Sequence, residues 1–242
     1  MRMNKYKSGS GLKNLAKNKL AGHYGQAIGI MMLKEVIQFF IYMIIRSIIP
    51  TTTIAGFILY MIIYLAVSVV IGVFSLGYSR FFLNLACGME HSYKDLFYGF
   101  KNQSEKALFL SMIFCLLQFI CMLPYEILLS GYLYQYEIRW LVYTGIALLI
   151  GLVIYIPIFI MISQSFYLLL DFPDRSAKEA LKLSIRIMKG RMGRYFYITV
   201  SFIPLMLLCF LSYGIGFLWL MPYMEMTYAC FFLDLMNPAR KE

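Results

Sequence analysis

Six long stretches of apolar residues, separated by short polar segments, constrain this chain more than any other feature of its sequence. The hydrocarbon core of a bilayer is about 30 Å thick and needs about 20 mostly apolar residues for each helix that crosses it. The stretches cover residues 26–49, 56–85, 107–129, 141–170, 195–212 and 214–236. The sequence therefore predicts an all-α fold, a polytopic transmembrane helical bundle with six spans.

The composition leaves little room for anything besides these spans. Of the 242 residues, 61% are hydrophobic and only 14% are charged, whereas about 25% of the residues in a soluble domain are charged. The polar segments between the apolar stretches are short. We therefore expect residues 1–242 to form a single integral membrane domain without a separate soluble domain.

The positions of the basic residues predict how the chain is oriented in the membrane. If the N-terminus lies inside, all Lys and Arg residues except Lys34, Arg46 and Arg139 belong to the inner side. Membrane proteins concentrate Lys and Arg on the cytoplasmic side, which also accounts for the net charge of +10. We expect a bacterial plasma-membrane protein with cytoplasmic N- and C-termini. Because no recognition motif accompanies the charge, we expect no nucleic-acid partner.

Two patterns that recur along the chain, helix N-cap residues and apolar residues at helical spacing, indicate an internal repeat. Ser92 and Ser176 are each followed three residues later by an acidic residue, Asp95 or Glu179, as at a helix N-terminus. Apolar residues then recur at helical spacing, which predicts amphipathic helices, and a third such stripe occupies residues 12–20. Each stripe precedes two apolar stretches, so we predict three repeated units of an amphipathic helix plus a helical hairpin. The units cover about residues 8–88, 89–173 and 174–242.

Five segments carry a resemblance to a known family. They are Leu-Lys-Asn-Leu-Ala-Lys at 12–17, Gly-His-Tyr-Gly-Gln-Ala at 22–27, Ser-Arg-Phe-Phe-Leu-Asn-Leu-Ala at 79–86, Asp-Leu-Phe-Tyr-Gly-Phe-Lys at 95–101 and Gly-Ile-Gly-Phe-Leu-Trp-Leu-Met-Pro-Tyr at 214–223. Together they resemble a family of bacterial multi-pass membrane proteins, common in Firmicutes, that is defined only as a domain of unknown function. The family is distantly similar to the membrane domain that accompanies some glycerophosphodiester phosphodiesterases. The resemblance implies a multi-pass plasma-membrane protein and assigns no functional residue.

Three charged residues lie well inside the apolar stretches, far from their ends. Lys34 and Glu35 lie about ten residues into the first stretch, and Glu225 lies ten residues before Leu235 in the sixth. At 1.5 Å per residue, both positions are about 15 Å deep, so we expect Lys34 and Glu225 to face one another. Charges inside a membrane often mark binding or transport sites. The pair is interpreted as a binding or coupling site for an ion or head group, or as a structural ion pair between the first and last helices.

Prolines and basic residues supply the other candidate positions. Pro157 and Pro222 lie within apolar stretches, where each removes a backbone donor and is expected to kink its helix for packing or to open a cavity. Arg80 is expected to contact lipid phosphate or to extend its charged end to the interface. The remaining candidate contacts with lipid head groups are Lys182, Arg186 and Lys189.

Motifs of known enzymes are absent from the sequence. It contains no H-E-x-x-H, no G-x-S-x-G and no phosphate-binding loop, and its five cysteines show no metal-ligand spacing. We therefore expect no enzymatic activity, no catalytic residue, no metal and no cofactor.

These features support two functional hypotheses. The first is a non-enzymatic membrane protein that binds membrane lipids or a partner, either another membrane protein or a membrane-active peptide, in a scaffold, envelope-stress or immunity role. The alternative is a transporter or lipid flippase that uses Lys34, Glu35, Glu225 and the kinked helices. A polar cavity that joins Glu225 to one face of the membrane favours transport, whereas a dry, tightly packed bundle favours the first hypothesis.

Overall fold

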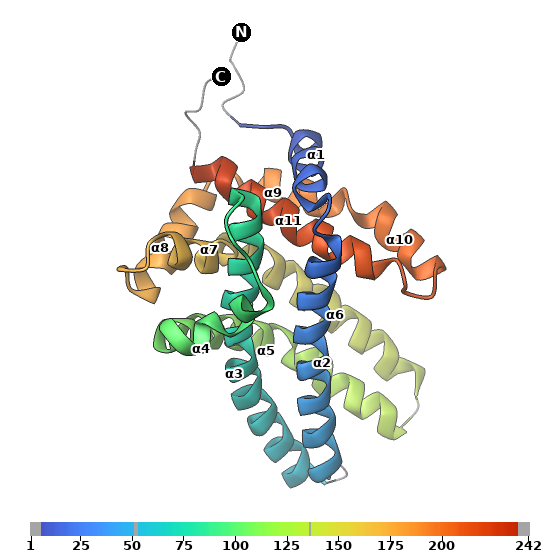
Figure 1. Cartoon of the computed structure of the whole chain (residues 1–242). Helices are drawn as coiled ribbons and strands as arrows, with labels where there is room; N and C mark the ends of the chain where they lie inside the picture. Colours follow the sequence, from blue (N-terminus) through green and yellow to red (C-terminus); the bar gives the residue numbers. More distant parts are fainter. Residues whose placement is uncertain (1–5, 51–52, 136, 237–242) are drawn as a thin grey trace.

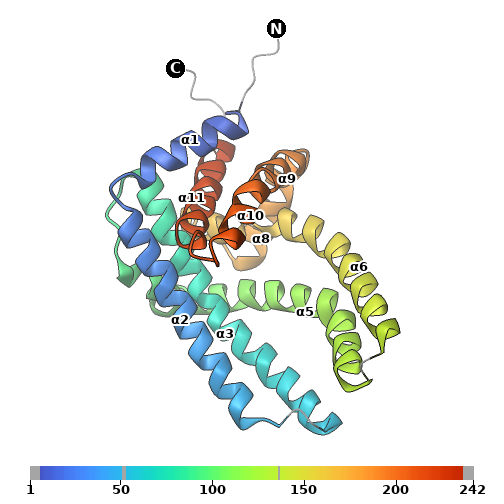
Figure 2. The ribbon, with the colours of Figure 1, turned by 90° about the vertical axis from the view of Figure 1, so that its right-hand side faces the viewer.

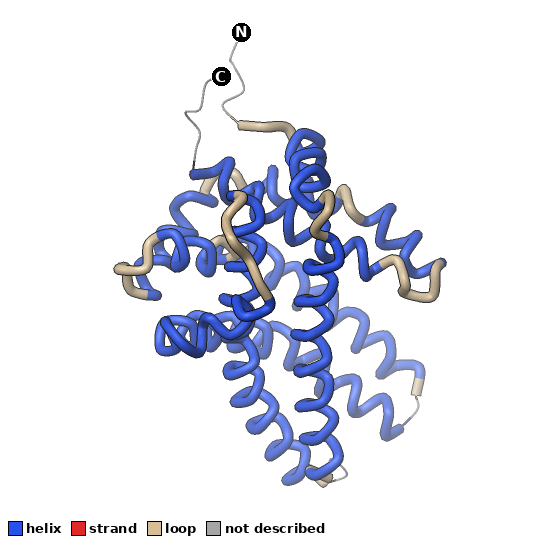
Figure 3. The backbone as a smooth tube through the Cα atoms, in the orientation of Figure 1, coloured by secondary structure: helices blue, strands red, loops and turns tan. Residues whose placement is uncertain are grey.

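The computed structural model describes residues 6–50, 53–135 and 137–236, and within these ranges the chain is helical and contains no strand (Figures 1 and 3). The first half contains α1 (Gly9–Leu20), α2 (Tyr24–Ile48), α3 (Ile54–Cys87), the 3-10 helix η1 (Tyr93–Phe97), α4 (Tyr98–Asn102) and α5 (Ser104–Gln135). The second half contains α6 (Ile138–Ile162), α7 (Ser165–Asp171), α8 (Ala177–Met188), α9 (Met192–Val200), α10 (Ile203–Leu211) and α11 (Phe217–Met236).

Five helical segments are long and apolar enough to cross a membrane. They are Tyr24–Ile48, Ile54–Cys87, Ser104–Tyr132, Ile138–Asp171 and Met192–Leu211. Their mean hydropathies range from 1.7 to 2.8, yet only 17–22% of the residues in these windows are buried. Large apolar side chains exposed over such lengths need hydrocarbon around them. The chain is therefore a membrane-embedded, multi-pass helical protein.

The sixth predicted stretch folds differently from the other five. It contains α11, which is not among the five candidate spans. Pro222, Glu225 and Asp234 lower its apolar character, and ten of its 20 residues are buried in the protein, with Phe231 and Phe232 almost fully so. Helix α11 packs against α1, α2, α3 and α10. The structure therefore supports five candidate spans together with one core helix, and it does not establish the six equivalent spans expected from the sequence.

Two hairpins of long helices diverge from this core. Helices α2 and α3 run side by side as one hairpin, and α5 and α6 form the second (Figures 1 and 2). Helix α5 also packs against α3, so the two hairpins share a seam near the core. Gly72 of α3 lies at this seam, where an added Cβ would come within 2.7 Å of Ser111 on α5. The small side chains at this seam let the helices approach closely.

The fourth apolar stretch is divided into α6 and α7 by a break at Ser163 and Gln164. Side-chain hydroxyls satisfy the backbone groups that the break exposes. The Ser163 hydroxyl donates to Ile160 O at 2.9 Å, and Ser184 of α8 donates to Met161 O at 2.8 Å while accepting from the Gln164 backbone N at 3.2 Å. Because apolar surroundings offer no water for these groups, α8 is part of what makes the break possible.

The fifth stretch is also broken, between α9 and α10. Pro204 stands in the first turn of α10, where a missing backbone donor costs little. The Ser201 carbonyl at the break accepts a hydrogen bond from Lys13 Nζ of α1 at 3.0 Å, and the same ammonium lies 3.8 Å from the centroid of the Phe202 ring. Burial lowers the pKa of Lys13. Lys13 of α1 therefore provides the hydrogen bond that the Ser201 carbonyl accepts at this break.

Both predicted N-terminal caps are present. The Ser92 backbone N–H donates to Asp95 Oδ2 at 3.0 Å, and the Ser176 N–H donates to Glu179 Oε2 at 2.9 Å, each within a complete capping box. The apolar stripe after Ser92 is mostly exposed, however, and only Leu96 is buried.

Candidate functional site

A cavity of about 360 Å³ lies between α2, α3 and α5, and both polar and apolar side chains line it. Its polar lining residues recur along each helix at intervals of four, seven or eight, which places them on one face of each helix. They are Lys34, Gln38 and Tyr42 from α2, Tyr60, Tyr64, Ser68 and Ser75 from α3, and Gln118 and Glu126 from α5. This cavity is called the polar groove below.

One wall of the polar groove is an ordered set of tyrosines. The rings of Tyr42 and Tyr64 stack with their centroids 4.8 Å apart, and the Tyr60 ring lies 5.9 Å from that of Tyr64. The Tyr42 hydroxyl is hydrogen-bonded to Ser68 Oγ at 2.8 Å, and Ser68 in turn donates to the Tyr64 carbonyl at 2.6 Å. Because these contacts join α2 to α3 within the protein, they hold the tyrosine rings in place without a ligand.

The polar groove is long. From Tyr60 to Ser75, both in its lining, α3 advances about 22 Å at 1.5 Å per residue. Lys34 supplies a positive charge to the lining and Glu126 supplies a negative one. The arrangement offers hydrogen bonds along most of a bilayer core, flanked by apolar side chains such as Phe119 and Met122.

Lys34 and Glu225, which were expected to face each other, form no ion pair with one another. The Lys34 ammonium instead bonds to Glu35 Oε1 at 3.2 Å and lies 5.1 Å from the centroid of the Tyr78 ring. Glu35 is itself about half exposed. Glu225 is not part of the polar groove lining.

Tyrosines of neighbouring helices pack against α11 on the residues that follow Glu225. The Tyr195 ring of α9 stacks on that of Tyr228 with the centroids 5.1 Å apart, and the Tyr167 ring of α7 stacks on Phe232 at 5.3 Å. Tyr78, Tyr167 and Tyr195 are each at least 90% buried. Within the described part of the chain, the Glu225 carboxylate has no ion-pair or hydrogen-bond partner.

The basic residues predicted to contact lipid differ in their surroundings: Arg80 contacts other side chains of the protein, whereas those on α8 are exposed. Arg80 Nε lies 3.2 Å from Asp95 Oδ1, and its guanidinium carbon lies 3.6 Å from the centroid of the Tyr98 ring, so much of its charge is engaged within the protein. On α8, Ala180 and Ser184 face the bundle. The predicted contacts with lipid head groups on the opposite, exposed face are Lys182, Arg186 and Lys189.

The predicted prolines lie inside helices, Pro157 in α6 and Pro222 in α11. Pro222 is buried one turn before Glu225. A third proline, Pro124 in α5, lies close to groove residues Leu123 and Glu126. The effect of Pro157 and Pro222 on helix direction stays a prediction.

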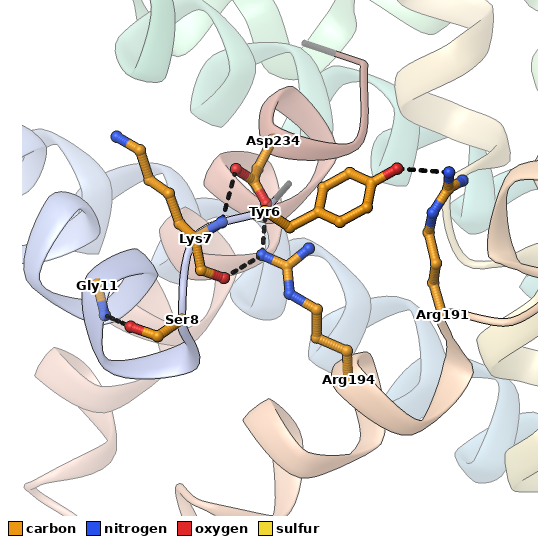
Figure 4. Close-up of polar contacts among 7 residues, drawn as sticks. All are labelled: Tyr6, Lys7, Ser8, Gly11, Arg191, Arg194 and Asp234. Carbon is orange, nitrogen blue, oxygen red and sulfur yellow. Dashed lines mark hydrogen bonds and ion pairs between the residues drawn. The ribbon is translucent and has the colours of Figure 1, made fainter. Parts of the chain in front are cut away.

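The N-terminal segment is tied to the C-terminal half by a polar cluster, shown in Figure 4. Asp234 of α11 pairs with Arg194 of α9 and also accepts from the Lys7 backbone N–H at 3.2 Å. Arg194 donates to the Lys7 carbonyl, and Arg191 donates to the Tyr6 hydroxyl. This cluster fixes α1 over the core and is called the terminal clamp.

A family model for proteins of unknown function, DUF975, matches residues 1–239, almost the entire chain. The chain belongs to the DUF975 family. No curated protein and no solved structure shows detectable similarity to it. The expected membership of an unknown-function family is therefore established for this DUF975 chain, whereas the Firmicutes distribution and the distant likeness to the phosphodiesterase membrane domain stay predictions.

Several groove residues of this DUF975 protein were not found by sequence reasoning. Tyr42, Tyr64 and Ser68 are ordinary residues in apolar stretches, and only a search for polar positions every three or four residues along α2 and α3 could have singled them out. Among the described residues, no group of three or more His, Cys, Asp or Glu side chains is arranged to hold a metal ion.

Proposed function

We propose that this protein is a non-enzymatic integral membrane protein whose polar groove binds a membrane lipid or another single-chain amphiphile. The observation that carries the proposal is a row of polar side chains that line a cavity between α2, α3 and α5. The outer faces of these helices are apolar and exposed. Polar groups facing hydrocarbon without partners cost free energy. A ligand with both polar and apolar parts satisfies the groove's two kinds of lining, and lipids are the most abundant such molecules in a membrane.

The size of the polar groove limits its occupant. Ligand pockets usually measure about 300–1,000 Å³, so 360 Å³ accommodates one chain with a small polar group, or part of a larger lipid. The exposed basic face of α8 adds attraction for anionic head groups, at about 1 kcal/mol for each Lys or Arg near the surface. Lipid binding of this kind fits a scaffold, an envelope-stress factor or an immunity determinant against membrane-active peptides.

A second candidate function is lipid transport, as a flippase or transporter. The length of the polar groove favours it, because a polar track of about 22 Å along α3 covers most of a bilayer core of about 30 Å. The separate position of Glu225 argues against a single continuous pathway through that carboxylate.

We also propose the orientation and the repeat that the sequence predicts. The excess of basic residues at the two ends and in the segments near α4 and α8 supports cytoplasmic N- and C-termini in a bacterial plasma membrane. The order of elements supports three repeated units, because short helical elements (α1, then η1 with α4, then α8) precede α2–α3, α5–α7 and α9–α11. Reporter fusions at both termini test the orientation, and signals from opposite compartments contradict it.

Native mass spectrometry of the purified protein tests lipid binding. Cys115 is a half-buried groove residue, so Cys115→Phe fills part of the cavity, and Leu116→Phe changes the adjacent residue, which is exposed and not part of the lining. We expect wild type and Leu116→Phe to retain a lipid and Cys115→Phe to retain at least about tenfold less. Equal retention by all three proteins contradicts groove binding.

Fluorescent-lipid scrambling in vesicles separates the two candidate functions. Lipid movement that depends on the wild-type groove and is lost in Cys115→Phe supports transport. Retained lipid without movement supports binding alone. Size-exclusion chromatography in detergent verifies that each variant is folded and monodisperse before it is compared.

A further inference from the structure

The segment from α9 to α11 begins and ends on the same side of the protein. Arg194 in α9 pairs with Asp234 in α11, and both bind the backbone of Lys7 in the terminal clamp. The tips of the α2–α3 and α5–α6 hairpins lie far from this clamp, whereas the α10–α11 tip lies nearer to it (Figures 1 and 2). Because both ends of the segment meet, it crosses the membrane either twice or not at all.

Helix α9 runs beside α1. A Cβ placed on Gly9 would lie 3.4 Å from Tyr197 Cε1, and Lys13 Nζ donates to the Ser201 carbonyl at 3.0 Å. Both contacts join positions that are 188 residues apart in the sequence. Two helices whose contacts keep the same separation one turn further on run side by side in the same direction.

The polar face of α1 marks the depth of these contacts. Asn14, Lys17 and Asn18 on that face are exposed, and α1 lies at the end of the molecule that holds the termini (Figure 1). Exposed groups of this kind need water or lipid head groups around them, so α1 lies at the membrane surface or above it. Ser201, about halfway along the candidate span Met192–Leu211, therefore lies near the membrane surface as well.

Only α10 and the start of α11 are left to enter the hydrocarbon. Helix α10 has nine residues, which advance about 14 Å at 1.5 Å per residue. That length covers about half of a bilayer core of about 30 Å. On the return, α11 packs against α1, and its buried residues begin at Leu220. The hairpin is therefore too short to reach the opposite face.

The tip of this hairpin contains no charge. No Lys, Arg, Asp or Glu occurs between Arg194 and Glu225. The α2–α3 hairpin has Arg46 near its tip, and the α5–α6 hairpin has the exposed Arg139–Glu137 pair. Charged residues are typical of hairpin tips that reach water, so their absence indicates that the α10–α11 tip stays in hydrocarbon.

The side chains around the tip are apolar and uncovered by the protein. Six large ones are each at least 60% exposed: Leu207, Leu208, Phe210, Leu211, Tyr213 and Ile215. A continuous exposed apolar surface of this kind marks a contact with a membrane or with another protein. The contacts with the surface helix α1 place it inside the membrane, where acyl chains cover it.

We propose that α9–α11 is a re-entrant hairpin, which enters the membrane from the side of the termini and returns to that side. Its tip is embedded in the leaflet nearer the termini, and the acyl chains of that leaflet are its partner. The chain then crosses the membrane four times, through α2, α3, α5 and the α6–α7 segment. The proposal does not depend on lipid binding in the polar groove.

Cysteine labelling of the full-length protein in membranes tests the depth of the tip. Tyr213→Cys places a thiol at the tip, where the native side chain is 99% exposed and its replacement disturbs no packing. Glu137→Cys is the matched control at the exposed tip of the α5–α6 hairpin. A charged, membrane-impermeant maleimide is added to intact cells and to inside-out vesicles, and peptide mass spectrometry measures the labelling.

We expect Glu137→Cys to react from the side opposite the termini. Tyr213→Cys should react at least about tenfold more slowly than this control from either side, because hydrocarbon excludes the charged reagent. After denaturation in sodium dodecyl sulfate both thiols should react equally. Rapid labelling of Tyr213→Cys from the same side as the control overturns the proposal, because the hairpin then crosses the membrane. Rapid labelling from the other side also overturns it, because the tip then lies in water.

Photo-crosslinking identifies what covers the tip. A photoreactive phenylalanine derivative in place of Tyr213 keeps an aromatic side chain at this position. We expect it to crosslink to phospholipid in irradiated membranes. A crosslink to a second copy of the chain or to another protein, without lipid, overturns the assignment of acyl chains as the partner.

Discussion

Arg194 of α9 and Asp234 of α11 form an ion pair that also holds the backbone of the N-terminal segment. Asp234 accepts the Lys7 N–H and Arg194 donates to the Lys7 carbonyl, so both polar groups of one peptide segment are bound between two helices (Figure 4). The side chains are only 21% and 11% exposed, respectively. Since three elements meet at this pair, it joins the beginning of the chain to its end.

Asp234→Asn should destabilise the protein by about 2–3 kcal/mol, because it leaves the mostly buried Arg194 without its counter-charge. Thermal unfolding in detergent, followed by intrinsic fluorescence, measures the change. Glu137→Gln is the control, since it removes the exposed Arg139–Glu137 pair and should cost less than about 0.5 kcal/mol. Equal losses in the two variants would mean that the terminal clamp adds no more than a surface pair.

Gly77→Ala should separate η1 from α3. A Cβ at Gly77 would lie 2.1 Å from the Leu96 carbonyl oxygen and 2.4 Å from that of Asp95, and backbone atoms cannot move aside without displacing the whole segment. We expect a loss of about 1–3 kcal/mol in unfolding free energy. Gly145→Ala in α6 meets no atom within 4 Å and should be neutral or stabilising by up to about 1 kcal/mol. A harmless Gly77→Ala contradicts the close contact.

Cysteine labelling should report on the polar groove. Cys87 is exposed, Cys115 lines the groove and Cys230 is 2% exposed. We expect a small membrane-permeant maleimide to react fastest with Cys87, more slowly with Cys115 and hardly at all with Cys230, as measured by peptide mass spectrometry. Adding a single-chain amphiphile should protect Cys115 alone. Protection of Cys87 to the same extent would indicate a general effect of the amphiphile.

The N-terminal cap of α8 should weaken in acid. Hydrogen bonds with Ser176 lower the pKa of Glu179 from its ordinary value of 4.5. A lowered folded pKa means that the carboxylate contributes stability above pH 4.5 and that the contribution is lost as the pH falls through the folded pKa. Amide hydrogen exchange in the first turn of α8, corrected for its intrinsic pH dependence, should therefore quicken as the pH falls from 4.5 through the folded pKa of Glu179.

Glu179→Gln is the control for this pH effect. The amide retains an acceptor oxygen but does not titrate, so protection of the first turn should be lower at neutral pH and should no longer fall on acidification. A variant that keeps the wild-type pH dependence would assign the effect to another group.

Hydropathy and capping were readable from the sequence because they are local properties. Apolar stretches locate the long helices whatever they pack against, and the Ser92 and Ser176 caps need only residues three positions away. The sequence also pointed to Glu225 as unusual, because a carboxylate is out of place in an apolar stretch.

The tertiary structure decided which face of each helix is buried and which side chains contact one another. Glu225 and Lys34 matched in depth, but depth along a helix does not fix rotation about its axis, and Lys34 bonds to its neighbour Glu35. Likewise α11 resembled the other spans in sequence, yet half of its residues are buried in packing with α1, α2, α3 and α10. Apolar residues suit lipid and protein interiors equally well, so hydropathy by itself determined where the helices are, and only packing determined which of them face the membrane and which polar residues share a cavity.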